Sequence, residues 1–145
     1  MGTLLICGLS PHPPLLIPDI GGDDIRGVKK TKNAMEEFAK VIKEKAPDTL
    51  IFITPHGPIF KDAIGLLGEE TLSGDFRRFR APQVKLTYKN DMELLRLIEE
   101  KAREASIPTI RFTRDTARRY GGSVELDHGT MVPLYYLDKA RLHPS

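Results

Sequence analysis

The sequence is poor in the residues that mark several protein classes. One cysteine in 145 residues excludes an intrachain disulfide framework. The 22 lysines and arginines nearly balance the 20 aspartates and glutamates, so bulk charge gives no general attraction to nucleic acids or acidic membranes. No run approaches the roughly 18 apolar residues of a membrane span, and the first apolar run is too short for a secretory signal. We therefore expect a cytoplasmic protein with no nucleic-acid partner and no membrane partner.

What the sequence does contain is an alternation of short apolar runs and amphipathic segments. This pattern predicts the α/β class, a single domain over residues 1–145, and a right-handed strand–helix–strand crossover at the start. Cys7 is interpreted as a small apolar residue inside the first strand, and Pro133 should lie near the first turn of the last helix. The predicted strands are 3–9, 48–54, 62–68, 83–88 and 107–112, the predicted helices are 28–46, 91–105 and 129–140, and residues 19–24 are a predicted loop.

Two histidines directly follow prolines at the ends of predicted strands. His12 lies in SPHPP, and His56 lies in TPHGP. Each proline fixes its own φ and keeps the preceding residue out of the helical region, so each imidazole is held on a stiff segment. The carboxyl ends of parallel strands form the usual working edge of an α/β sheet. This arrangement predicts that His12 and His56 are metal ligands, whereas the alternative is two unrelated turn histidines that cap backbone groups.

A third histidine, His128, lies between Asp127 and Gly129, just before the last predicted helix. An imidazole titrates near neutral pH, which suits general acid–base catalysis, and the adjacent Asp127 can orient it. Taken alone, this tripeptide predicts no more than the start of a helix, at which the glycine lets the backbone turn. His143 is interpreted as a solvated residue of the C-terminal tail.

Four segments together resemble the LigB-type catalytic subunits of class III extradiol ring-cleavage dioxygenases. They are most similar to the branch grouped with the AmmeMemoRadiSam-system and Memo-like proteins. The segments are SPHPPLLIPDIGG, PDTLIFITPHGP, LSGDFRRFRAP and LDHGTMVPLYYL, in the order of the family.

The resemblance implies a three-layer α/β/α sandwich around a mostly parallel or mixed sheet. The chain would be the N-terminal part of the family domain and would therefore be incomplete. Fe(II), with Zn²⁺ as an alternative, would be held by His12 and His56, and His128 would be the acid–base catalyst. The substrates would be a catecholic molecule and O₂, and the chain would form a homo-oligomer or bind a completing subunit.

The family uses a glutamate as its third metal ligand, and no acid of this chain matches that position. Asp127 is expected to support His128 from outside the set of metal ligands. Two alternative functions follow: a Memo-like protein acting in redox chemistry or protein interaction, and a Zn²⁺-dependent hydrolase. The arginine-rich segments 76–80 and 111–120 are expected at a subunit interface or beside an anionic substrate. The acids near the motifs are Asp19, Asp62, Glu69, Glu70, Glu125 and Asp127.

Overall fold

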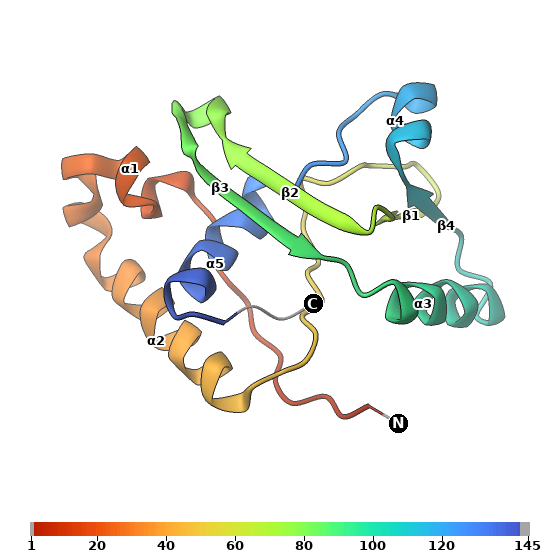
Figure 1. Cartoon of the computed structure of the whole chain (residues 1–145), viewed down its shortest axis with the longest axis horizontal. Helices are drawn as coiled ribbons and strands as arrows, with labels where there is room; N and C mark the ends of the chain where they lie inside the picture. Colours follow the sequence, from red (N-terminus) through yellow and green to blue (C-terminus); the bar gives the residue numbers. More distant parts are fainter. Residues whose placement is uncertain (1, 143–145) are drawn as a thin grey trace.

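The computed structural model describes residues 2–142, in which helices alternate with short strands (Figure 1). His143, predicted to be a tail residue, lies outside the described residues. The α-helices are α1 (Pro18–Gly21), α2 (Lys29–Lys45), α3 (Met92–Glu104), α4 (Arg114–Tyr120) and α5 (His128–Lys139). The 3₁₀ helices are η1 (Pro14–Leu16), η2 (Gly22–Val28) and η3 (Arg77–Phe79). The strands are β1 (Ile64–Leu67), β2 (Thr71–Phe76), β3 (Ala81–Lys89) and β4 (Thr109–Phe112).

The described strands pair into two sheets of two strands each. β1 and β4 are parallel, with Ile64 opposite Thr109, whereas β2 and β3 are antiparallel, with Thr71 opposite Lys89. The α/β class is therefore confirmed, and both kinds of pairing occur, although they are divided between two sheets.

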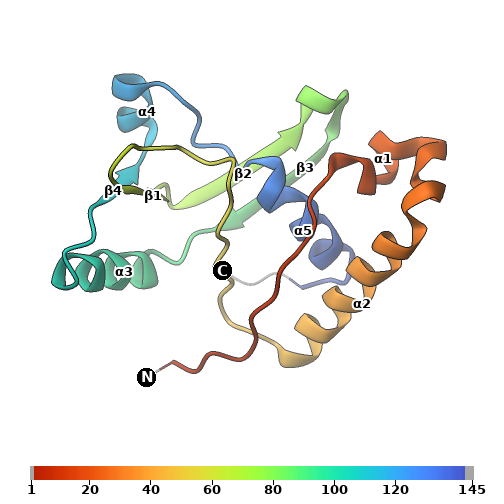
Figure 2. The same ribbon diagram turned by 180° about the vertical axis from the view of Figure 1, so that it is seen from behind.

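The core surrounds α5, which packs against α2 on one side and against β2 and β3 on the other (Figures 1 and 2). α5 is mostly apolar, and Met131 and Val132 are almost completely buried. Leu16 and Ile17, at the end of η1, have no exposed surface, so the segment that follows His12 is anchored in the same core.

The two strands predicted at 3–9 and 48–54 are not formed, and the predicted crossover is therefore wrong. Both segments are coil (Figure 2), and no backbone hydrogen bond in the described chain joins them to a strand. A cavity of about 610 Å³ lies between residues 49–60 on one side and β1 and α3 on the other. Without a neighbouring strand, Cys7 is exposed rather than buried, and Ile53 is 97% exposed.

The remaining differences from the sequence prediction are local. Pro133 lies inside α5 rather than in its first turn, which removes the N–H that would otherwise bind the carbonyl of Gly129. The predicted loop at 19–24 is occupied by α1 and η2. β2, α4, η1 and η3 were not predicted either, whereas α2, α3, α5, β1, β3 and β4 lie where helices and strands were expected.

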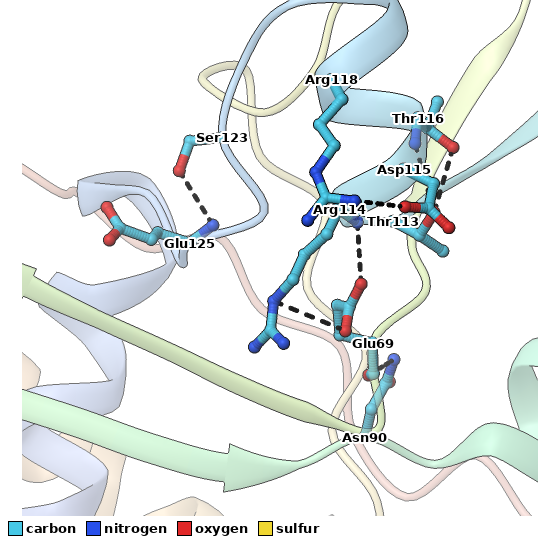
Figure 3. Close-up of polar contacts among 9 residues, drawn as sticks. All are labelled: Glu69, Asn90, Thr113, Arg114, Asp115, Thr116, Arg118, Ser123 and Glu125. Atoms are coloured by element: carbon cyan, nitrogen blue, oxygen red, sulfur yellow. Dashed lines mark hydrogen bonds and ion pairs between the residues drawn. The ribbon is translucent and has the colours of Figure 1, made fainter.

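Several arginines of the two basic segments bind carboxylates within the chain. In Figure 3, Arg114 donates its backbone N–H to Glu69, and Arg118 forms an ion pair with Asp115 at 3.0 Å. Arg77 binds the carboxylate of Asp75 at 2.6 Å. These contacts place the arginines on the surface around β2 and α4. No helix in residues 2–142 is long and apolar enough to span a membrane.

Candidate metal centre

The imidazoles of His12, His56 and His128 lie together, although the three residues are far apart in the sequence. One nitrogen from each ring falls within 4.8 Å of the other two. The ring centroids of His56 and His128 are 4.1 Å apart in a stacked arrangement, and those of His12 and His56 are 5.0 Å apart. The structure therefore brings together the three histidines that the sequence motifs indicated.

His128 is held at this position because it is the first residue of α5. Asp127 caps the helix, since its Oδ1 accepts a hydrogen bond of 2.7 Å from the backbone N–H of Gly129. Burial and the neighbouring His56 lower the pKa of His128 below its usual value, while Asp127 acts in the opposite direction. This shift favours the neutral form of the His128 ring, which can act as a base or a ligand.

His12 is fixed by contacts on both sides of its segment. The Ser10 hydroxyl contacts the sulfur of Met35 in α2 at 3.4 Å. Beyond His12, the hydroxyl of Tyr136 donates a buried hydrogen bond of 2.6 Å to the carbonyl of Leu16. Because Tyr136 belongs to α5, the helix that carries His128 also anchors the chain next to His12.

His56 is attached to the same helix through Thr54. The Thr54 hydroxyl donates to Oδ1 of Asp127 at 2.7 Å and accepts from the backbone N–H of His56 at 3.3 Å. The oxygens of Asp127 bind Thr54, Gly129 and, at 3.4 Å, the hydroxyl of Thr130. In the described chain none of its hydrogen bonds goes to a histidine ring, so its support of His128 stays a prediction.

Gly129 allows the His56 segment to approach α5 closely. A Cβ atom at this position would lie 2.5 Å from Oγ1 of Thr54, 2.8 Å from Oδ1 of Asp127 and 3.2 Å from the ring of His56. The sequence predicted that this glycine lets the backbone turn, but its φ lies outside the left-handed region. Glycine is needed here because a side chain would collide with Thr54 and Asp127.

Phe79 is a further residue of the site that the sequence argument did not single out. Its ring meets the ring of His128 edge-on, with 5.4 Å between the centroids. Phe79 belongs to η3, inside the arginine-rich segment 76–80. The alternation of aromatic and basic residues in this segment gave no indication that Phe79 packs against a histidine. The site also adjoins an open pocket of about 620 Å³, lined by Leu9, Ser10, Pro11, His12, Pro13 and His128.

The separation of the nitrogens suits a bound metal ion. The Nε2 atoms of His12 and His56 are 3.0 Å apart, so one ring donates a hydrogen bond to the other when no ion is present. Two ligand atoms about 2.1 Å from one ion, at right angles, are also about 3.0 Å apart, whereas a tetrahedral angle gives about 3.4 Å.

Among residues 2–142, no carboxylate joins the three converging imidazoles. The acids named from the sequence therefore supply no third ligand in this group.

Comparison with known proteins identifies the family. Residues 6–144 match the family described as the catalytic LigB subunit of aromatic ring-opening dioxygenase. The chain belongs to the LigB family. This family assignment covers all four motifs that predicted it, including the three histidines of the site.

This chain is also similar to a curated protein from Clostridium acetobutylicum, Protein CA_C1420. The two are 44% identical over 131 residues, which cover 90% of this chain and 28% of that protein. The chain therefore spans little more than a quarter of the length of this relative. No solved structure matches the chain.

Proposed function

We propose that the cluster of His12, His56 and His128 is the metal centre of an Fe(II)-dependent extradiol dioxygenase. His12 and His56 would hold the ion, and His128 would transfer protons. The observation that carries this proposal is the convergence of three imidazoles beside an open pocket, in a chain of the LigB family. The substrate would be a catechol-type ring, opened beside its two hydroxyl groups with insertion of both atoms of O₂.

Bound Fe(II) would supply open positions at which a catecholate and O₂ can bind together. The residues of this chain would provide the rest. The centroid of the His128 ring lies 5.8 Å from that of His12, so His128 would stand beside a substrate bound at the ion. Because its lowered pKa keeps it neutral, it would accept a proton from a substrate hydroxyl and later return one. Phe79 would exclude water from one side of this imidazole.

The decisive experiment is O₂ uptake by the Fe(II)-loaded protein with a catechol, followed by the absorbance of the yellow ring-opened product. His128→Ala should lower product formation by about 10²–10⁴-fold and still bind Fe(II). His12→Ala and His56→Ala should lose the metal itself. Full activity in His128→Ala would remove the acid–base role, and tight Fe(II) binding in both other variants would remove the proposed ligands.

The absence of a carboxylate among the converging described groups favours a second candidate. Three imidazoles are the ligand set of some catalytic zinc sites, in which a bound water becomes the nucleophile. On this alternative His128 is a ligand, and the protein is a hydrolase. Zinc in protein purified without added metal, together with esterase or amidase activity, would support the hydrolase and displace the dioxygenase.

The Memo-like alternative and the completing subunit stay predictions. An anaerobic titration that finds no Fe(II) binding at micromolar metal would favour a role in redox chemistry or protein interaction. A homo-oligomer or a second subunit would be the source of the missing carboxylate, and Fe(II) affinity should then rise when the subunits are combined.

A further inference from the structure

Residues 49–54, the segment that leads to His56, are tied at both ends to aspartates that cap helices. At one end, Thr49 donates a hydrogen bond of 2.6 Å to Asp91, the N-cap of α3. At the other end, Thr54 donates a hydrogen bond of 2.7 Å to Asp127, the N-cap of α5.

These two bridges replace the ladder of backbone hydrogen bonds that would normally fix such a segment. The segment alternates like a strand, with Phe52 packed on the core and Ile53 facing outward. However, no backbone hydrogen bond in the described chain connects it to a strand, so its position depends on side chains. An extended segment without a ladder can slide along its own axis, and a shift of one residue would turn His56 away from the other two imidazoles.

We propose that Thr54 is a positioning residue that sets His56 against His12 and His128 through its bridge to Asp127. This inference rests on the proposed metal centre. The bridge is short and continuous: the backbone N–H of His56 binds Thr54, Thr54 binds Asp127, and Asp127 binds the first turn of α5. A Cβ atom at Gly129 would collide with this bridge, so the absence of a side chain there lets the His56 segment and α5 come close enough to form it.

The bridge between Thr49 and Asp91 provides a matched control on the same segment. It has the same donor, the same kind of acceptor and nearly the same length. It differs in its distance from the histidines, because it ends at α3 rather than at α5. Loss of either bridge should lower the stability of the fold, but only loss of the Thr54 bridge should disturb the imidazoles.

The experiment compares Thr54→Val, Thr54→Ser and Thr49→Val with the wild-type chain. The first measurement is an NMR contact between the ring protons of His56 and His128 in metal-free protein, which the stacked rings predict. The second is a Co(II) titration followed by visible absorption. Asp127→Ser is a second test of the bridge if Thr54→Val does not fold, because serine still caps α5 but is too short to reach Thr54 as well.

We expect Thr54→Val to lose the ring contact and to bind Co(II) about 10–100-fold more weakly. Thr54→Ser keeps the hydroxyl and should match the wild type in ring contact and Co(II) affinity. Thr49→Val should match it in these two measurements as well, although its fold should be less stable. A Thr54→Val protein with unchanged ring contact and Co(II) affinity would overturn the proposal. Equal losses in Thr49→Val would do the same, because they would indicate general destabilisation.

The two measurements also separate this inference from the proposed function. If the wild type binds no Co(II) while only Thr54→Val loses the ring contact, the metal centre is refuted and the positioning role stands. If the wild type itself shows no contact between the two rings, the positioning role is refuted.

Discussion

Replacement of Gly129 by alanine tests the geometry of the site without touching any histidine. The new Cβ would lie 2.5 Å from Oγ1 of Thr54 and 2.8 Å from Oδ1 of Asp127, both well inside normal contact distance. Either the His56 segment moves away from α5, or the bridge between Thr54 and Asp127 breaks. Both changes would disturb the proposed metal centre and the start of α5.

The expected loss of stability follows from three contributions. Overpacking costs about 1–3 kcal/mol, and loss of the bridging hydrogen bond costs about 1 kcal/mol. The better helix propensity of alanine returns at most about 1 kcal/mol. The net loss is about 2 kcal/mol, which corresponds to a fall of about 4–8 °C in Tm for a domain of this size.

Thermal unfolding of Gly129→Ala, followed by circular dichroism, measures this loss. Gly27→Ala is the matched control, because Gly27 is exposed and its added Cβ would meet no atom within 4 Å. The control should change the free energy of unfolding by less than about 0.5 kcal/mol. A Tm for Gly129→Ala equal to or above that of the wild type would show that the close approach does not exist.

Two further predictions concern the anchoring of the His12 segment and the surface beside β2. Tyr136→Phe removes the buried hydrogen bond to the carbonyl of Leu16 and should cost about 1–3 kcal/mol in urea unfolding. Tyr135→Phe should be nearly neutral, because the Tyr135 hydroxyl makes no such bond to any residue that the structure describes. Hydrogen bonds from Arg77 lower the pKa of Asp75 to about 2, below its usual 3.8, so the ionised carboxylate stabilises the fold above about pH 4 and loses this effect as the pH falls towards 2. Asp75→Asn should therefore be less stable than the wild type at pH 7 and equal to it near pH 2; a constant difference would contradict the assigned pKa.

The three long helices, α2, α3 and α5, were predictable because their signals are local. α3 has a clear apolar face and is capped by Asp91, whose side chain accepts from the N–H of Leu94. α5 is capped in the same way by Asp127. Capping residues and helical periodicity both act within a few neighbouring residues, so a single sequence contains the information.

The strands were harder because pairing depends on distant partners. The run that contains Phe52 and Ile53 has the composition of a buried strand, yet no neighbour within residues 2–142 supplies a ladder. β2 was missed for the opposite reason, since Ser73, Gly74 and Asp75 interrupt its apolar pattern. A Cβ at Gly74 would lie 2.6 Å from both the carbonyl oxygen of Leu126 and the sulfur of Met131, so the close packing of α5 requires glycine there.

The histidines of the site were predictable, whereas the residues that hold them were not. The repeated proline–histidine motif indicated His12 and His56, and His128 was added only when its Asp-His-Gly tripeptide was considered together with them and with the LigB resemblance. By contrast, the contact of Thr54 with Asp127 joins residues 73 positions apart. The residue before a proline adopts extended backbone, which threonine favours, so the local sequence around Thr54 carries no sign of this role.

The central claim is that His12 and His56 bind one metal ion together. The most direct measurement is an anaerobic Fe(II) titration of the whole chain and of His12→Ala and His56→Ala. We predict one ion for each wild-type chain and a loss of binding in either variant. Undiminished Fe(II) binding in one of these variants, or no binding to the wild type, would contradict the account.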